Sequence, residues 1–387
     1  MTRTRGRHRR QKRGRALRGV LAGTALALTA AATMISASQA TVDDNPGELK
    51  PLTSRAELST LRLSEDLVPE RSLDRLTTRL GRPVGVDTVL ADADRTLRDP
   101  ADCTAAERAA LPITPEATRA YCWDAADTRG WRSGPVTTSG DADDDGRWGE
   151  RRVLLSAWSD GTASRVAFVD ATELDRLRYT WVGLTVPTDD GSAYRPLRTA
   201  VSGMVWYQDK LLVTTRDGVY VHDMHRVQRA AGADGSRFVL PAVGVYRPAG
   251  ASPVGLSLDR TTSPDSLVAR GGDRLWRYAF SADPGRTGLL ATGRATEAFR
   301  SGADGPGGVL SHRSRWYVTQ AGEEHGTLWR QGASEARATY CGAHDSHRCW
   351  SGSTSSLSYW QETGEVWSQS GRTLFALPLS SIDRSLD

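Results

Sequence analysis

The chain has 387 residues, of which 39% are hydrophobic and 25% charged, and its formal net charge is +4. Nine basic residues lie within the first 18 positions, before any acid, so that losing residues 1–40 turns the net charge of +4 into −5. The remaining chain has no basic excess to neutralise phosphates, which excludes nucleic acid as the expected partner. About 260 residues remain after the N-terminal region, enough for one large all-β domain.

The first 40 residues have the three-part layout of a secretory signal peptide. The basic segment MTRTRGRHRRQKRGRALR is followed by an Ala- and Thr-rich apolar stretch over 19–35, and then by the small residues Ser38 and Ala40. We expect cleavage near Ala40 and a secreted protein. The alternative is an uncleaved membrane anchor, because the apolar stretch approaches the ~17 residues that can just span a bilayer.

Residues 41–130 differ from the rest of the chain and predict an N-terminal extension with short helices. A helix is expected over 72–80, a second over 99–111 with Asp99 as N-cap and Pro100 in its first turn, and a third over 114–123 with Thr114 as N-cap. This helical flank would pack on the domain formed by residues 131–387.

The four cysteines form two local pairs in a chain expected to leave the reducing cytosol. The simplest interpretation is a disulfide between Cys103 and Cys122, pinning the last two predicted helices together, and another between Cys341 and Cys349. Four cysteines permit three connectivities, and free buried thiols are the other alternative.

The segment DADDDGRWGE, residues 141–150, places Asp141, Asp143 and Asp145 at alternate positions with Gly146 after the third. This spacing supplies the first half of an EF-hand calcium loop, but the twelfth position, which should be Glu, is Arg152. Two interpretations remain open: a calcium-binding hairpin, or a solvated acidic loop between two strands.

A ribbon of three short apolar runs separated by polar or glycine-containing turns recurs along the chain. The segment SGMVWYQDKLLVTTRDGVYVHDM, residues 202–224, has relatives at 254–280, 307–331 and 355–379, and a longer unit precedes it at 134–187. Fourth runs follow at 179–187, 238–246, 285–293 and 336–342. Four short strands in each unit of about 50 residues are typical of propeller blades.

We therefore predict an all-β fold, a five-bladed β-propeller of four-stranded blades with a short helical N-terminal flank. A sixth blade is possible if residues 50–100 hide one, and a β-sandwich or two smaller sheets are the alternative. The last unit runs out of chain after its third strand. A strand from the N-terminal region could complete that unit and close the ring.

Over residues 130–380 the chain resembles secreted actinobacterial β-propellers of uncharacterised function, through GPVTTSGDA, the 202–224 ribbon and SSLSYWQETGEVWSQSGRTLFAL. More distantly it looks like YVTN-type and lactonase-like propellers. The resemblance implies that any catalysis would occur at the axial channel, where the innermost strands begin. None of the residues expected there, such as Ser133, Ser202, Pro253, Gly307 and Ser355, can ionise near neutral pH.

Charged residues occur instead in the turns between the second and third strands. Arg216 and Asp217 lie in one such turn, and Glu323, Glu324 and His325 lie in another. Solvated hairpin tips would have the same composition, but a ligand, if one is held, is expected at these residues. Arg270 and Asp273 mark a third turn.

The histidines and tryptophans favour structural roles. His344 and His347, between Cys341 and Cys349, are expected on an exposed disulfide loop rather than on zinc. His222 and His225 are expected at the surface, with Asp223 capping a turn. Most of the twelve tryptophans lie in apolar runs and are expected to pack between blades.

The sequence thus favours an exported, monomeric, non-catalytic binding module whose protein or glycan ligand it does not specify. Calcium is the only possible cofactor. The alternatives are a lactonase- or lyase-like propeller enzyme with a divergent site at Glu323, Glu324 or His325, and a glycan-binding propeller. The enzyme needs clustered titratable groups and the glycan binder needs repeated equivalent pockets, whereas a scaffold needs neither.

Overall fold

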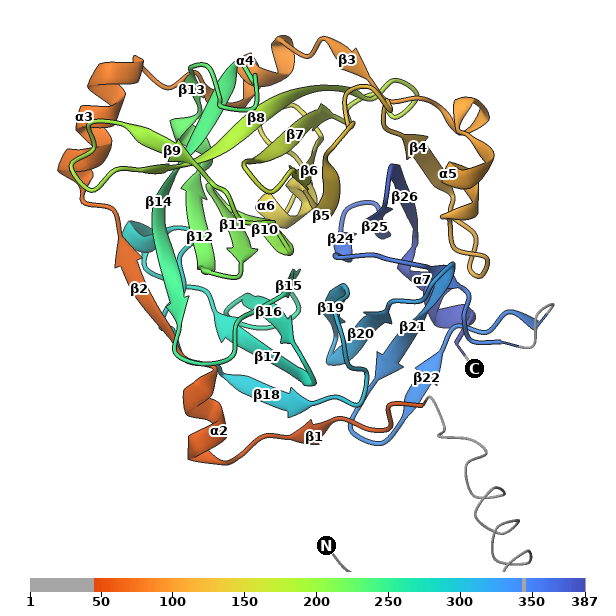
Figure 1. The fold of residues 1–387 in the computed structure, drawn as a ribbon. Coiled ribbons are helices and arrows are strands. Elements are labelled where there is room, and N and C mark those ends of the chain that lie inside the picture. Colours follow the sequence, from red (N-terminus) through yellow and green to blue (C-terminus); the bar gives the residue numbers. More distant parts are fainter. Residues whose placement is uncertain (1–44, 343–345, 387) are drawn as a thin grey trace, which may run out of the picture. The chain divides into compact units, whose positions relative to one another are not determined.

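The computed structural model describes residues 45–342 and 346–386. The signal peptide expected at residues 1–40 and His344 therefore lie outside the described residues. The unit that begins at Asn45 is a β-propeller: its strands radiate around a central axis, with the first strand of each repeat innermost (Figure 1). Within the described ranges, no helix has both the length and the apolarity needed to cross a membrane.

The ring contains four-stranded antiparallel meanders, which we number as blades I to V. Their strands, from the axis outward, are as follows. Blade I is β5 (Arg132–Thr138), β6 (Val153–Ser159), β7 (Ser164–Asp170) and β8 (Arg178–Pro187); blade II is β10 (Gly203–Tyr207), β11 (Lys210–Thr215), β12 (Gly218–Asp223) and β14 (Phe238–Pro248). Blade III is β15 (Gly255–Asp259), β16 (Ser266–Gly271), β17 (Arg274–Ala279) and β18 (Glu297–Arg300); blade IV is β19 (Val309–His312), β20 (Arg315–Gln320), β21 (His325–Gln331) and β22 (Ala336–Ala338). Blade V is β24 (Ser358–Trp360), β25 (Glu365–Ser370), β26 (Thr373–Pro378) and β4 (Arg119–Cys122).

Blade V confirms that an N-terminal strand completes the last unit. Strand β4 pairs antiparallel with β26, with Cys122 opposite Thr373. Blades I and II share one sheet, because their outer strands β8 and β14 pair in parallel. This pairing begins with Val182 opposite Phe238. The fourth strand of blade III is β18, so the strand expected at 285–293 is wrong: that segment holds a 3₁₀ turn (Pro284–Arg286) and one isolated bridge at Leu290.

Tight turns join the strands of the blades. Gln208, between β10 and β11, has φ of 51°, and Arg313 and Ser314, between β19 and β20, have φ of 50° and 63°. Positive φ values match the right-handed twist of the paired strands, as primed hairpin turns require. Polar residues at these positions therefore set the register of the hairpins.

Residues 45–122 form a belt around the outside of the ring (Figure 1). The belt begins at blade IV, where Leu49 N–H donates to the Gly332 carbonyl, and then adds β1 (Lys50–Pro51) to β18, β2 (Leu63–Leu67) to β14 and β3 (Arg95–Thr96) to β8. It ends as β4 in blade V. The segment 50–100, considered as a hidden sixth blade, forms no four-stranded meander. Its helices are α2 (Arg55–Thr60), α3 (Glu70–Leu80) and α4 (Gly85–Ala91).

Two of the three predicted helices of this region need correction. The helix expected over 72–80 is confirmed as α3. The helix expected over 99–111 divides into a 3₁₀ turn (Pro100–Asp102) and α5 (Ala105–Ala109), because Thr104 and Glu107 form a capping box that starts a new helix. The helix expected over 114–123 is wrong, since its second half is β4, whose pairing with β26 outweighs local propensity.

Both predicted disulfides are confirmed, Cys103 with Cys122 and Cys341 with Cys349. The first links the end of the 3₁₀ turn to β4 and does not join two helices. The remaining short elements are α6 (Ser139–Ala142), β9 (Tyr194–Pro196), the 3₁₀ turn Met224–Arg226, β13 (Gln228–Arg229), β23 (Trp350–Ser351) and α7 (Leu379–Arg384).

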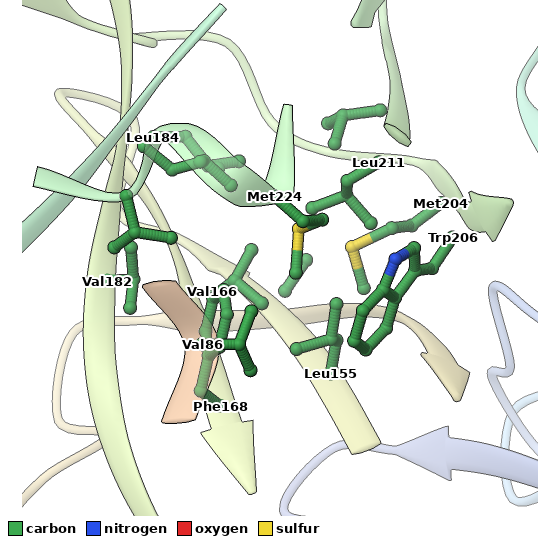
Figure 2. Close-up of a cluster of buried hydrophobic side chains, with 14 of the residues drawn as sticks. Val86, Leu155, Val166, Phe168, Val182, Leu184, Met204, Trp206, Leu211 and Met224 are labelled. Carbon is green, nitrogen blue, oxygen red and sulfur yellow. The ribbon is translucent and has the colours of Figure 1, made fainter. Parts of the chain in front are cut away.

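The core lies between neighbouring blades. Figure 2 shows one cluster, in which Phe168 and Leu155 of blade I face Met204 and Trp206 of blade II, and Val86 of α4 packs against them. Side chains from both blades bury one continuous apolar surface, which an isolated blade could not do. The belt thus contributes to the core through α4.

Candidate functional site

The innermost strands meet at the face of the ring where they begin, which we call the upper face. Val136 N–H of β5 donates to the Ser356 hydroxyl next to β24 at 2.7 Å. A Cβ at Gly203 would lie 2.8 Å from the backbone nitrogen of Leu256, and one at Gly255 would lie 2.8 Å from the Gly307 carbonyl oxygen. The backbones of neighbouring inner strands therefore approach one another closely at this face.

Helix α6 follows the lower end of β5 and packs against β10 and β24. Gln208 N–H donates to the Ala142 carbonyl at 3.0 Å, and Arg260 Nη2 donates to the Asp141 carbonyl at 2.8 Å. The carboxylate of Asp141 accepts hydrogen bonds from the hydroxyls of Thr137 at 2.6 Å and Ser358 at 2.8 Å. Burial raises the pKa of Asp141 to about 6. This acid therefore holds three elements together at the axis.

The three aspartates predicted as calcium ligands do not share one site. Asp141 points into the protein and is 3% exposed, whereas Asp143 and Asp145 are exposed, and each accepts a hydrogen bond from a backbone N–H of its own loop. Asp141 lies in α6, whereas Asp143 and Asp145 lie in the loop that follows this helix. Within the described residues, the metal-ligating side chains that converge in a group of three are Cys103, Glu107 and Cys122, and the two cysteines are joined in a disulfide.

The charged turns of the upper face are separate from one another. Arg216 and Asp217, between β11 and β12, are exposed and 3.6 Å apart. Glu323 and Glu324 are exposed, and His325 is half-buried and pairs with Ser351 of β23. These five residues lie in blades II and IV, which are not neighbours, so they form no common site.

Arg270 differs from the solvated turn residue that the sequence predicts. It is 1% exposed, and its guanidinium donates to the carbonyls of Thr319 at 2.5 Å and Ala303 at 2.9 Å. Burial lowers the pKa of Arg270 to about 10. Its role is to join blades III and IV.

The histidine predictions are confirmed in part. Asp223 caps the 3₁₀ turn by accepting from His225 N–H, and His225 is exposed. His222, expected at the surface, is fully buried and contacts the Leu240 carbonyl through Nδ1 at 3.0 Å, and burial lowers its pKa to about 4. His347 contacts the Thr339 carbonyl through Nδ1 at 3.3 Å, beside the rings of Trp329 and Tyr340.

Ten of the twelve tryptophans are buried, which confirms that most of them serve packing. Trp131 and Trp148 are the two that are half-buried. The ring of Trp148 lies 5.0 Å from that of Trp206 at a tilt of 45°, and Trp148 lines a pocket of about 330 Å³ with Asp143, Asp144 and Arg260. Trp131 has a different environment, so the described residues do not show the repeated equivalent pockets that a glycan-binding propeller needs.

One pocket, which we call the Tyr220 pocket, has a volume of about 620 Å³ and lies where β8 and β14 diverge. From Gly244 onward β14 pairs with β2 instead of β8, and this exchange opens a fork between the two strands. The floor is apolar and includes Val186, Val245 and Leu67, the last of which is 41% exposed.

Polar groups converge on this floor. Tyr220 is 7% exposed, and its hydroxyl makes no hydrogen bond with the described residues. Burial raises the pKa of Tyr220, so the phenol stays protonated at neutral pH and can donate. Arg195 lies at the rim without an ion-pair partner in the described part of the chain, whereas Arg247 is 3.3 Å from Asp66. Apolar surface with a few convergent polar groups is typical of small-molecule sites.

The sequence did not single out Tyr220 or Arg195. Tyr220 reads as an ordinary aromatic of a third strand, and Arg195 lies in a connection without a motif. Only the fork between β8 and β14, which depends on distant pairing with β2, brings them together. Leu67, in a belt segment of the sequence LSEDL, carried no signal either.

Comparisons with known proteins give little on function. No family model and no curated protein match this chain. Among solved structures, a gluconolactonase from Xanthomonas campestris matches with 16% identity, over 77% of this chain and 98% of that chain, at a TM-score of 0.26. A likeness at this level carries no argument about activity or site, and it does not bear on export or on an actinobacterial source.

Proposed function

We propose that this chain is an exported, monomeric, non-catalytic β-propeller that binds a small anionic molecule with an apolar body in the Tyr220 pocket. The observation that carries the proposal is the combination, in the Tyr220 pocket, of an apolar floor with two donors that have no partner among the described residues, the Tyr220 hydroxyl and the Arg195 guanidinium. The apolar body would replace water over Leu67 and Val245, and a carboxylate would accept from both donors.

Binding fits the pocket better than catalysis does. General acid–base chemistry needs a group whose pKa lies near the working pH, and burial moves the pKa of Tyr220 upward, away from that range.

Export is supported by the two disulfides, since such bonds persist in oxidising compartments and are rare in the cytosol. The cleavage near Ala40 can be read directly from the mass of the protein recovered from culture medium. Recovery of the full-length chain in the membrane fraction would favour the anchored alternative.

The binding proposal can be tested by calorimetry on the secreted protein with a panel of aryl and alkyl carboxylates. Tyr220→Phe removes one donor and Arg195→Ala the other, and each should weaken binding about five- to twentyfold, which corresponds to about 1–2 kcal/mol. Arg198→Ala is the matched control, because Arg198 is exposed in the same connection but does not line the pocket.

Two results would overturn the proposal. One is binding that Tyr220→Phe and Arg195→Ala leave unchanged, which would place the ligand elsewhere. The other is turnover of a lactone panel by the purified protein, which would favour the enzyme alternative.

A further inference from the structure

A second site, independent of the Tyr220 pocket, surrounds the buried guanidinium of Arg165 on β7. Arg165 is 6% exposed, and its guanidinium carbon lies 3.8 Å from the ring centroid of Trp131 and 3.7 Å from that of Trp181. The two indoles thus hold the cation between them. The surrounding pocket, which we call the Arg165 pocket, has a volume of about 270 Å³.

Arg165 forms no ion pair with a carboxylate of the described residues, although the nearby charges of Asp234 and Asp127 act to raise its pKa. Its Nη2 donates to the Asp127 carbonyl at 2.6 Å, while Nε is buried without a hydrogen bond. Burial lowers the pKa of Arg165 to about 10. Cation–π contact offsets part of the cost of desolvation, but an unpaired buried cation remains a strong attractor for an anion.

A carboxylate with a free oxygen faces the same pocket. Asp234 accepts from the Ser236 hydroxyl at 2.7 Å through Oδ1, while its Oδ2 is buried without a partner. The other nearby acid, Asp127, is already engaged, since its Oδ2 lies 2.8 Å from Arg95 Nε and accepts from the Tyr179 hydroxyl at 2.7 Å. Asp234 is therefore the acid that is free to accept from a ligand.

The lining of the Arg165 pocket is balanced in charge, with three arginines and three aspartates. A ligand with net charge would leave one sign unpaired, whereas a molecule with one anionic and one cationic group would complement both free partners. We propose that the Arg165 pocket binds a small zwitterion of the α-amino acid class, with its carboxylate on Arg165 and its ammonium on Asp234.

The test is calorimetric titration of the mature protein with the common free α-amino acids, with acetate and methylammonium as half-ligands. At least one amino acid should bind, and each half-ligand should bind at least tenfold more weakly. Asp234→Asn should weaken amino-acid binding at least tenfold without changing the melting temperature. Asp94→Asn is the matched control, because Asp94 lines the pocket but pairs with Arg95 and Arg237. The Asp94→Asn variant should bind the amino acid as tightly as the unchanged protein does.

Arg165→Lys keeps the charge and loses the planar fork, so this variant should also weaken amino-acid binding. If the Arg165→Lys variant does not fold, the effect of Asp234→Asn alone tests the proposal. The proposal is overturned if no amino acid binds, if acetate binds as tightly as the amino acid, or if Asp234→Asn and Asp94→Asn behave alike. Binding of neutral monosaccharides in place of amino acids would equally overturn it. Because an amino acid with an apolar side chain also fits the ligand class of the Tyr220 pocket, the loss of binding in Asp234→Asn, and not binding alone, assigns the ligand to the Arg165 pocket.

Discussion

The ring and the belt are both rich in β-strands, but different forces hold them. Strand β6 of the ring is buried along its whole length, whereas four of the five residues of β2 in the belt are exposed. The ring is stabilised by apolar contact between blades, and the belt by backbone pairing to outer strands, by one disulfide and by charged links. The difference teaches that the belt, although largely exposed, completes the ring: it supplies the fourth strand of blade V and, through α4, apolar side chains to the core beside blades I and II.

Two buried acids show the same contrast. Asp141 at the axis accepts from two hydroxyls, and burial raises its pKa to about 6. For Glu107 of α5, burial alone would raise the pKa. Hydrogen bonds from Arg98 and from Thr104 outweigh this effect and lower the pKa to about 2. Glu107 also lies 3.2 Å from Arg372 of blade V. The belt acid is therefore stabilised as an anion, and the ring acid is stabilised when protonated.

The largest effect is expected from deleting the belt. Without residues 45–122, blade V lacks β4 and leaves the edge of β26 unpaired. We expect no cooperative thermal transition, a loss comparable to the whole stability of about 5–15 kcal/mol. Deletion of residues 45–61 is the control and should preserve a cooperative transition. A fully cooperative transition without residues 45–122 would show that the ring closes by itself.

Trp123, where the belt joins the ring, is fully buried between Trp158, Tyr179 and Trp181. Trp123→Ala should lower the free energy of unfolding by about 3–5 kcal/mol, measured by urea denaturation. Trp148→Ala, at the half-buried indole, should cost less than half as much. Equal losses would contradict the expectation that the fully buried indole of Trp123 contributes more to stability than the half-buried indole of Trp148.

The two disulfides should contribute unequally to the free energy of unfolding. Cys103 and Cys122 close a loop of 19 residues and tie the belt to blade V, whereas Cys341 and Cys349 close a loop of 8. Replacing the first pair by serine should cost about 3 kcal/mol and the second about 2.5 kcal/mol at most. Calorimetric melting of the two double variants checks the order, and the reverse order would show that the belt needs no covalent fastening.

The ring acid predicts a dependence of stability on pH. The pKa of Asp141 rises from 3.8 to about 6 on folding. Its contribution to the free energy of unfolding, at most about 3 kcal/mol, is therefore full below pH 3.8 and is lost as the pH rises through 6. Asp141→Asn should remove this slope from melting curves between pH 4 and 7. Asp143→Asn, at an exposed neighbour, should keep it, and an unchanged slope in Asp141→Asn would contradict the assignment.

The belt acid, Glu107, predicts a pH dependence of stability with the opposite sign. Glu107 contributes above pH 4.5, and this contribution is lost as the pH falls toward 2. Glu107→Gln should therefore cost about 2 kcal/mol at pH 7, through the loss of charge-assisted hydrogen bonds, and much less at pH 3. Exposed Glu116→Gln is the control. A loss that is equal at both pH values would point to packing rather than charge.

Local patterns determined the repeat, the strand-turn-strand units and both disulfides, because hydrophobic alternation, turn residues and short cysteine spacings act over a few residues. They also indicated that blade V needed a strand from elsewhere. Local propensity failed at 114–123, where pairing with β26 makes a strand of a helix-like sequence, and at 285–293, where β18 takes the outer place in blade III.

The tertiary structure alone decided the candidate sites. The alternating aspartates of residues 141–145 looked like one site, but α6 turns Asp141 into the axis. The Tyr220 pocket needs β2 to displace β8 beside β14, and the Arg165 pocket needs Trp131, Trp181 and Asp234 to meet from separate segments. Such sites depend on contacts between residues far apart in sequence, and no local signal in this chain marks them.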